Sequence, residues 1–534
     1  MMIQKLKSYL ESIEITPTNW LLGISGILMA RFFLEAISSP TTSGIAASDA
    51  STLIHYYLFF MAFAFGSLLF FHFAIPKWRE VLPQFVLYLF VAVLIAPILD
   101  FILSKGAGAT MSYIFYTPKD LLYALFTFFG SANGITVGIR IEAAIIILFS
   151  GFLIYKIEKN ILRAIIGATV LYLAIFIFVS LPSIVSMFGS IANPIHFFAN
   201  AIANSATFPN NLHSALLYGY PARALEIGFN FVMGKIWFLI TTALLGVWFY
   251  LSQKVKFIHI IKNSRPERVA FHLLAVSAGF YLANIISPIP LLVWNDYLSI
   301  VVLLISFYFS WMFAVCVNDI ADEKIDEVSN SSRPLITKGL SHNDMKQASI
   351  IFLTVSLIGA FLAGYYAFFL VLAFTSLYYI YSAPPARFKS IPFFSSFLIG
   401  LCVLTEVMAG FFLLSESKLM AAFPTKVIAA IVISVFLWSN IRDLKDIKGD
   451  SKEGIKTVPV LFGSVWGPRI TGIMAATAFL LVPLFAGTNF LFLISVPAAI
   501  FTYYFCVRKP YNEKFVFLAY FIFVLTLLFL LVFN

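Results

Sequence analysis

Six of the eleven aspartates in the sequence lie in two short segments, and their spacing is suited to binding metal ions. Each segment carries three aspartates at positions i, i+3 and i+7, which places all three on one face of a helix. Corresponding aspartates are 124 residues apart, which indicates an internal duplication. The two trios are Asp319, Asp322 and Asp326, and Asp443, Asp446 and Asp450.

Three carboxylates on one helix face repel one another, so something must offset their charge. A divalent cation does so directly. Magnesium prefers hard oxygen ligands and is usually held by one or two carboxylates together with the phosphate oxygens of a substrate. Two such faces, opposed across a cavity, would bind a diphosphate through bridging ions. The alternative is that both segments are solvated loop charges, which is a weaker explanation for two matching clusters than for one.

Basic residues near these segments could hold a phosphate leaving group. Between two apolar runs the sequence carries Arg387 and Lys389 after a double proline, which stiffens the turn. Arg333 follows the first acidic segment, and Lys445 lies inside the second. The alternative is that these cations only reflect the excess of Lys and Arg in cytoplasmic loops of membrane proteins.

The composition places these segments in a membrane protein. Of the 534 residues, 61% are hydrophobic and only 11% are charged, with a mean hydropathy of +0.95. These values exclude a water-soluble enzyme and a disordered chain. The net charge of +10 is expected when Lys and Arg gather in cytoplasmic loops, so it does not indicate nucleic-acid binding.

Stretches of about 20 mostly apolar residues predict fifteen membrane spans. If the amino terminus is cytoplasmic, 27 of the 35 Lys and Arg residues fall on the cytoplasmic side, and both acidic segments lie there too. The regions 104–138 and 188–229 are the least certain in this count. The predicted spans are 19–38, 53–75, 82–104, 139–155, 164–187, 230–252, 272–290, 298–317, 347–363, 366–382, 392–414, 425–441, 469–487, 489–506 and 514–533.

The chain is predicted to be an all-α polytopic membrane protein with two domains. Residues 1–252 form an N-terminal membrane domain of six spans, and residues 272–534 form a domain of nine spans. The charge-dense stretch 253–271 is predicted to be a basic cytoplasmic linker between them, or alternatively an ordinary cytoplasmic loop.

The second half of the sequence resembles the UbiA superfamily of intramembrane prenyltransferases over roughly residues 268–534. The segment from Asn318 to Asp326 fits the family's NDxxDxxxD pattern, and Asp446 and Asp450 fit its DxxxD pattern. The stretch from Tyr381 to Lys389 is similar to the family's YSxPPxRxK loop. Three separate motifs in the same order make the resemblance specific.

The resemblance implies a nine-helix bundle around a cavity that is capped on the cytoplasmic side by the acidic segments. It implies Mg²⁺ as cofactor, an isoprenyl diphosphate as donor, and an aromatic or polar lipid-precursor molecule as acceptor. Residue chemistry agrees, because an allylic diphosphate ionises when metal ions neutralise its leaving charge, and the carbocation requires a dry pocket lined by aromatic rings.

The resemblance also implies roles for individual residues of the site. Asn318, Asp322 and Asp326 form one metal site and Asp446 and Asp450 the other, and these five are the predicted catalytic residues. Asp319 and Asp443 are metal ligands or support the ligands. The diphosphate is held by Tyr381, Arg387 and Lys389, with Arg333 and Lys445. Glu406, inside a predicted span, either contacts the acceptor or is a neutral or paired packing residue.

Two other functions remain open from the sequence. One is a non-enzymatic membrane carrier or permease whose acidic loops bind a cation for structural reasons, although a carrier does not need two matched metal faces. The other is phosphoribosyl-type transfer, or alcohol phosphotransfer, on the same scaffold. The protein is predicted to lie in the plasma membrane, without nucleic-acid partners.

The N-terminal half carries no motif of comparable specificity. Arg31 and Glu35 are one helical turn apart inside a predicted span, which favours a neutralising ion pair over a functional site. Lys235 is predicted to extend outward from its span. The sequence does not decide between a substrate-presenting accessory, a transporter-like module and a second enzyme.

Overall fold

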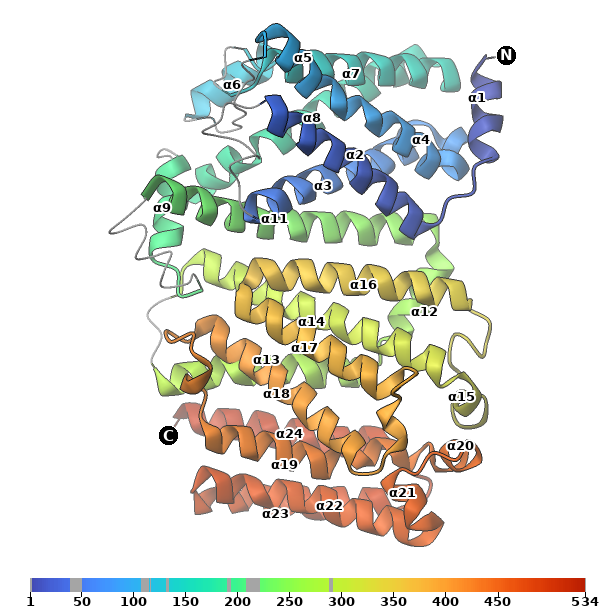
Figure 1. The fold of residues 1–534 in the computed structure, drawn as a ribbon, viewed down its shortest axis with the longest axis vertical. Coiled ribbons are helices and arrows are strands. Elements are labelled where there is room, and N and C mark those ends of the chain that lie inside the picture. The colour runs from blue at the N-terminus through green and yellow to red at the C-terminus, as the bar shows by residue number, and fades with distance from the viewer. Residues whose placement is uncertain are drawn as a thin grey trace. The chain divides into compact units, whose positions relative to one another are not determined.

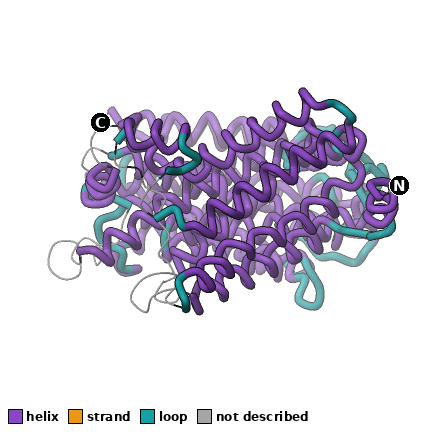
Figure 2. The backbone as a smooth tube through the Cα atoms, turned by 90° about the horizontal axis from the view of Figure 1, so that it is seen from above, coloured by secondary structure: helices purple, strands orange, loops and turns teal. Residues whose placement is uncertain are grey.

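The computed structural model describes residues 2–38, 50–106, 115, 117–130, 134–189, 194–207, 221–287 and 292–533. The regular secondary structure of these residues is entirely helical (Figure 2). Fifteen helical segments within the described ranges are long and apolar enough to cross a bilayer. The chain is therefore an integral, multi-pass membrane protein. The division into six and nine spans remains a prediction, since it was derived from the same criteria of length and composition.

The chain divides into two compact units (Figure 1). One consists of Met1–Ser252 and Val293–Leu298, and the other of Gln253–Leu292 and Ser299–Asn534. Each unit is built from helices that pack on one another, because a helix can satisfy its own backbone hydrogen bonds in lipid.

The first unit contains most of the N-terminal half of the sequence. Its helices are α1 (Met2–Glu11), α2 (Pro17–Ser38), α3 (Ala50–Ala74), η2 (Pro76–Val81), α4 (Leu82–Leu89), η3 (Phe90–Leu94), α5 (Ile95–Leu103), α6 (Pro118–Phe126), α7 (Val137–Glu158), α8 (Ile161–Gly189), α9 (Pro194–Ala203) and α11 (Pro221–Ser252).

The second unit contains both acidic segments. Its helices are α12 (Lys254–Asn263), α13 (Pro266–Ile286), most of α14 (Trp294–Ala321), α15 (Glu323–Ser329), α16 (His342–Ala363), α17 (Tyr365–Ser382), η4 (Phe388–Ser390), α18 (Phe394–Leu414), η5 (Met420–Ala422), α19 (Thr425–Trp438), η6 (Ser439–Leu444), α20 (Ile447–Lys452), α21 (Val458–Leu461), α22 (Gly463–Ala486), η7 (Asn489–Leu491), α23 (Phe492–Val507) and α24 (Glu513–Phe533).

The third apolar segment of the first unit is not one continuous α-helix. Residues 90–94 form the 3-10 helix η3 between α4 and α5. A 3-10 segment changes the hydrogen-bonding pattern of the backbone and exposes carbonyl groups to other partners. The carbonyl of Val93 accepts a hydrogen bond from the guanidinium of Arg31 in α2.

Helices α13 and α18 of the second unit approach each other through glycines. A Cβ atom added at Gly279 would come within 2.1 Å of the Val407 carbonyl oxygen, and one added at Gly410 within 2.0 Å of the Val276 carbonyl oxygen. Small residues allow membrane helices to pack backbone against backbone. This contact fixes α13, whose N-terminal end carries two arginines of the candidate site.

The acidic helices α15 and α20 contact each other. They lie at the same end of the second unit, although more than 100 residues separate them in the sequence (Figure 1). This end also holds α21 and the beginning of α16.

The stretch 253–271 forms α12 and the first turns of α13, and it belongs to the second unit. It carries apolar residues at helical spacing, of which Ile260 is buried. That it is a basic cytoplasmic linker between two domains, or alternatively an ordinary cytoplasmic loop, stays a prediction.

The prediction that Lys235 extends outward is wrong. Its side chain is only 2% exposed, and its ammonium donates a hydrogen bond of 3.1 Å to the Asn295 carboxamide oxygen. A buried amide offers the ammonium a partner that the lipid does not.

Replacing Gly279 with alanine is expected to destabilise the second unit by about 1–3 kcal/mol, because the added methyl group must push α13 and α18 apart. The matched control is Gly246→Ala in α11, where an added Cβ meets no atom within 4 Å. Thermal unfolding in detergent measures both. Equal melting temperatures for the two variants would contradict the close helix contact.

Candidate functional site

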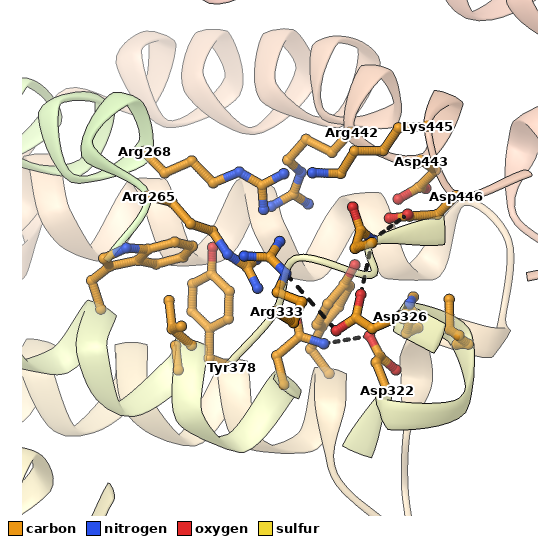
Figure 3. Close-up of a pocket in the computed structure, with 18 residues that line it drawn as sticks. Arg265, Arg268, Asp322, Asp326, Arg333, Tyr378, Arg442, Asp443, Lys445 and Asp446 are labelled. Atoms are coloured by element: carbon orange, nitrogen blue, oxygen red, sulfur yellow. Dashed lines mark hydrogen bonds and ion pairs between the residues drawn. The ribbon is translucent and has the colours of Figure 1, made fainter. Parts of the chain in front are cut away.

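The acidic end of the second unit contains a cavity of about 40 Å³. Acidic, basic and aromatic side chains border it, and Figure 3 shows that they come from several helices and converge on one space. Its charged lining residues are Arg265, Arg268, Asp322, Asp326, Arg333, Lys389, Arg442, Asp443, Lys445 and Asp446.

The two acidic segments are joined by a single amide. The Asn330 side chain donates hydrogen bonds to Asp326 Oδ1, at 2.8 Å, and to Asp446 Oδ1, at 2.9 Å. Gly449 permits this approach, because a Cβ atom there would lie 2.6 Å from Ser329 Oγ. Asp326 and Asp446, one from each segment, therefore lie close together, and their binding of a metal ion stays a prediction.

Lys389 is a second link between the acidic segments. Its ammonium lies 2.8 Å from Asp322 Oδ2 and 3.5 Å from Asp450 Oδ1. Arg387 also contacts Asp322, at 3.0 Å. Burial would raise the pKa of Asp322, but the charges of Lys389 and Arg387 outweigh burial and lower it. Burial likewise opposes the charge on Lys389, yet the two aspartates raise its pKa above the ordinary value.

The turn after α17 explains why Lys389 reaches the acidic helices. Helix α17 ends at Ser382, before Pro384 and Pro385, neither of which can donate the hydrogen bond that a helix would require. The chain then reverses, and the short helix η4 carries Lys389, which is 6% exposed.

Two of the predicted metal ligands do not border the cavity. Asp319 accepts hydrogen bonds from Asn263, at 2.6 Å, and from Arg265, at 2.5 Å. Asp450 is fully buried, and neither of its carboxylate oxygens has a hydrogen-bond partner among the described residues. Burial raises the pKa of Asp450 to about 7, against the opposing effect of Lys389.

Asp326 lines the cavity, unlike Asp319 and Asp450, and neighbouring groups shift the pKa of its carboxyl group. Burial and the charge of Asp319 raise the pKa of Asp326 to about 6, although Arg333 and a hydrogen bond from Asn330 oppose the shift. A raised pKa means that the surroundings, here chiefly burial, disfavour the charged form of the carboxyl group.

The opposite side of the cavity is cationic. The guanidinium groups of Arg268 and Arg442 point toward each other beside the ammonium of Lys445 (Figure 3). Glu513 lies 3.3 Å from Arg268 and 3.0 Å from Lys445. Burial and the charge of Arg268 lower the pKa of Lys445 to about 8, against the opposing effect of Glu513. Positive charge is therefore crowded at this corner.

Aromatic rings form the third side of the cavity. Trp311, Tyr378 and Tyr381 line it. Behind them, the His272 ring lies 4.4 Å from the Trp311 ring, centroid to centroid, and His272 Nδ1 lies 2.5 Å from Glu406 Oε1.

Nine of the thirteen predicted site residues border this cavity, and four do not. Glu406 is fully buried and reaches the cavity wall only through His272, so the alternative of a paired interior carboxyl describes its position. Arg387 contacts Asp322 from outside the cavity lining. The residues that line the cavity are Asn318, Asp322, Asp326, Arg333, Tyr381, Lys389, Asp443, Lys445 and Asp446.

Several lining residues were not predicted from the sequence. Arg265 and Arg268 belong to the stretch predicted to be a linker, and Arg442, which directly precedes the second acidic segment, was not assigned to the site. Asn330 lies four residues after Asp326, so its spacing on the helix face was an available signal. No feature of the sequence distinguishes Trp311 and Tyr378, because aromatic residues are abundant throughout the chain.

The oxygen-bearing side chains of this site are of the kind that Mg²⁺ binds, but they are not arranged as a complete set of metal ligands. Among the described residues, no three His, Cys, Asp or Glu side chains converge as a ready metal site. Magnesium commonly takes only one or two carboxylates and completes its shell with water and phosphate oxygens. The oxygens of Asp450, which lack hydrogen-bond partners among the described residues, and the two carboxylates that share Asn330 offer ligands of this kind.

Comparison with known proteins finds related sequences for the second half of the chain. Residues 273–527 match the model of the UbiA prenyltransferase family. A digeranylgeranylglyceryl phosphate synthase from Methanobrevibacter smithii is 25% identical, over 45% of this chain and 83% of the relative. Chlorophyll synthase from Avena sativa is 30% identical, over 28% of this chain and 40% of the relative.

Among solved structures, a UbiA homolog from Archaeoglobus fulgidus bound to GPP and Mg²⁺ is 21% identical, with a TM-score of 0.41. This alignment covers 51% of this chain and 96% of the other.

Replacing Lys389 with methionine should destabilise the protein by about 3 kcal/mol, because Asp450 would be left buried without a cation and Asp322 with only Arg387. Chemical unfolding in detergent measures the loss. Lys448→Met, which alters an exposed lysine of α20, is the matched control and should unfold like the unmodified protein. The bridging role of Lys389 is excluded if its variant is equally stable.

Proposed function

Because residues 273–527 belong to the UbiA prenyltransferase family, we propose that the chain transfers a prenyl group from a prenyl diphosphate to a lipid-precursor acceptor, with Mg²⁺ as cofactor. The observation that carries this proposal is the cavity in which both acidic segments, a cationic side and an aromatic side meet.

Asp326 and Asp446 are the residues best placed to hold the cofactor together with the diphosphate, since both line the cavity and share Asn330. Asn318 and Asp443 complete the oxygen-rich surface around them. Bound Mg²⁺ would neutralise the charge that develops on the departing diphosphate.

Lys389 and Arg333 are placed to contact phosphate oxygens. Lys389 pairs with Asp322 and Asp450 in the structure described here, so the arrival of cations at these carboxylates would free its ammonium for the diphosphate. A cavity of about 40 Å³ has room for a few water molecules, so the long basic side chains must move aside to admit the donor.

The aromatic side suits the carbocation character of the transferred group. Trp311, Tyr378 and Tyr381 present their rings next to the charged residues. Ring faces attract positive charge, and a dry wall protects an allylic cation from water. His272 and Glu406 act behind this wall as positioning residues for Trp311.

The cationic corner favours an acceptor with an anionic group. Among the described residues, Glu513 forms ion pairs with Arg268 and Lys445. Asp443 and Asp446 also attract the cations of this corner, but the proposal assigns these two carboxylates to Mg²⁺. The relative from Methanobrevibacter smithii is named a digeranylgeranylglyceryl phosphate synthase. We assign the corner to the phosphate of a glycerol phosphate lipid precursor in preference to an uncharged aromatic acceptor.

Both acidic segments would face the cytoplasm, with the amino terminus on the same side, in the plasma membrane. The excess of Lys and Arg in alternate loops supports this orientation.

The variants Asp326→Asn and Asp446→Asn are expected to reduce Mg²⁺-dependent consumption of geranylgeranyl diphosphate by about 100-fold or more, because each loses a carboxylate ligand of the Mg²⁺ that would neutralise the leaving group. Both can retain the hydrogen bond from Asn330, so the fold should persist. The effect is measured as the pyrophosphate that the purified protein releases from geranylgeranyl diphosphate, with and without Mg²⁺. Glu327→Gln changes an exposed carboxylate of α15 and should remain fully active. Full activity of both aspartate variants would refute the metal assignment.

Lys445→Met should raise the KM for a glycerol phosphate acceptor by about tenfold, while the KM for the donor stays within about twofold, since the acceptor would lose one charge-assisted contact. Steady-state kinetics with each substrate varied in turn separates the two constants. Lys448→Met again provides the control. If the donor KM rises instead, Lys445 belongs to the diphosphate site.

A further inference from the structure

Helix α12 joins two helices that are long and apolar enough to cross the membrane. One residue, Gln253, separates it from α11, and two residues separate it from α13. Figure 1 shows α12 near the end of the second unit that also holds α15. Connections this short keep α12 at the boundary between the bilayer and water.

One face of α12 packs against the rest of the second unit. Lys256, Ile260 and Asn263 recur at i, i+4 and i+7, so they share one side of the helix. The ammonium of Lys256 lies 2.7 Å from Asp344 Oδ1. Ile260 is buried, and Asn263 donates a hydrogen bond of 2.6 Å to Asp319 Oδ2. These contacts fix the rotation of α12 about its axis.

The opposite face of α12 is exposed and mostly apolar. Val255 is 68% exposed, Ile258 is 37% exposed and Ile261 is 44% exposed. Lys254 and Lys262 are exposed at the two ends of this apolar stripe. Ile258 is four residues from Lys254 and from Lys262, and three residues from Val255 and from Ile261. All five side chains therefore lie on one side of the helix.

The membrane–water interface suits this face better than water or the hydrocarbon core does. Water disfavours a stripe of adjacent aliphatic side chains, and hydrocarbon disfavours a lysine ammonium. At the interface, aliphatic side chains can enter the acyl region while lysines extend to the headgroups. The sequence of α12 contains three lysines and no aspartate or glutamate. Its charge is therefore complementary to anionic headgroups.

We propose that the exposed face of α12 is a docking surface for the anionic surface of the bilayer. Val255, Ile258 and Ile261 would enter the boundary between headgroups and acyl chains, and Lys254 and Lys262 would contact headgroups of net negative charge. A bilayer of zwitterionic lipid would accept the aliphatic side chains but would offer the lysines no net opposite charge. This proposal does not depend on the transferase activity proposed above.

The C-terminal end of α12 connects this surface to the cavity of the second unit. The indole N–H of Trp311 donates a hydrogen bond of 2.7 Å to the carbonyl of Ser264, which directly follows α12. Arg333 donates to the carboxamide oxygen of Asn263 at 3.4 Å. Trp311 and Arg333 both line the cavity. Docking of α12 on the bilayer would therefore hold two lining residues in position.

The test uses the full-length protein with a bimane fluorophore attached at Ile258→Cys, in nanodiscs of equal parts phosphatidylcholine and phosphatidylglycerol. In one preparation the phosphatidylcholine chains are brominated, and in the other the phosphatidylglycerol chains are. The three native cysteines are buried, so the unmodified protein is the labelling control. We expect brominated phosphatidylglycerol to quench the fluorescence at least about threefold more strongly than brominated phosphatidylcholine.

Three results of this experiment would overturn the proposal. Equal quenching by the two lipids would show an apolar contact without preference for anionic headgroups. Quenching by aqueous iodide and by neither lipid would place the exposed face of α12 in water. Quenching by none of these agents would show that protein covers this face.

A double variant tests the two lysines of the exposed face. Lys254→Gln together with Lys262→Gln should reduce the preference for phosphatidylglycerol to about onefold, while both lipids still quench because the aliphatic side chains remain. The matched control is Lys448→Gln together with Lys452→Gln, which removes two exposed lysines of α20 and should keep the preference. A preference that persists without Lys254 and Lys262, or that is lost equally in the control, would overturn the proposal.

Discussion

The acidic end of the second unit depends on one constraint, which is that carboxylates crowded at the end of an apolar bundle must be neutralised. Lys389 meets this constraint for Asp322 and Asp450, and Asn330 joins Asp326 to Asp446. Buried charges are stable only when paired and hydrogen-bonded. Under the proposed function, these carboxylates would exchange the lysine and the amide for metal ions.

Helix packing provides the geometry for that exchange. Gly279 and Gly410 bring α13 against α18, and Gly449 brings α20 against α15, in each case at a distance that a side chain would prevent. The first contact positions Arg265 and Arg268 and the second aligns the two acidic segments. Glycines therefore help to determine which charges meet, both within an acidic segment, at Gly449, and away from the charged residues, at Gly279 and Gly410.

The chemistry of the second half could be predicted from the sequence because its motifs are local. Paired Asp motifs and the loop from Tyr381 to Lys389 were sufficient to predict the family and the transferase class, and the family match confirms both. Arg265 and Arg268 could not be identified in the same way. Cations in a cytoplasmic loop are expected in any membrane protein, so only the folded chain shows which of them face the cavity.

The first half shows the opposite case. The ion pair between Arg31 and Glu35 could be predicted because a helix places residues four apart on one face. Glu142 is more than 100 residues away, and no periodicity connects it to Arg31. Charge pairing within the membrane is therefore a property of the packed helices, and the sequence alone did not show that Glu142 contacts Arg31.

The charge balance of the second unit also bears on the acceptor. Seven cationic and seven acidic side chains either line its cavity or form ion pairs with residues that do. The protein alone is thus close to neutral there. If two divalent ions bound at the acidic segments together with one diphosphate, they would carry more charge than the diphosphate, so the loaded site would gain positive charge in addition to that of Arg268 and Lys445. A phosphate on the acceptor would restore the balance, and an uncharged aromatic acceptor would not.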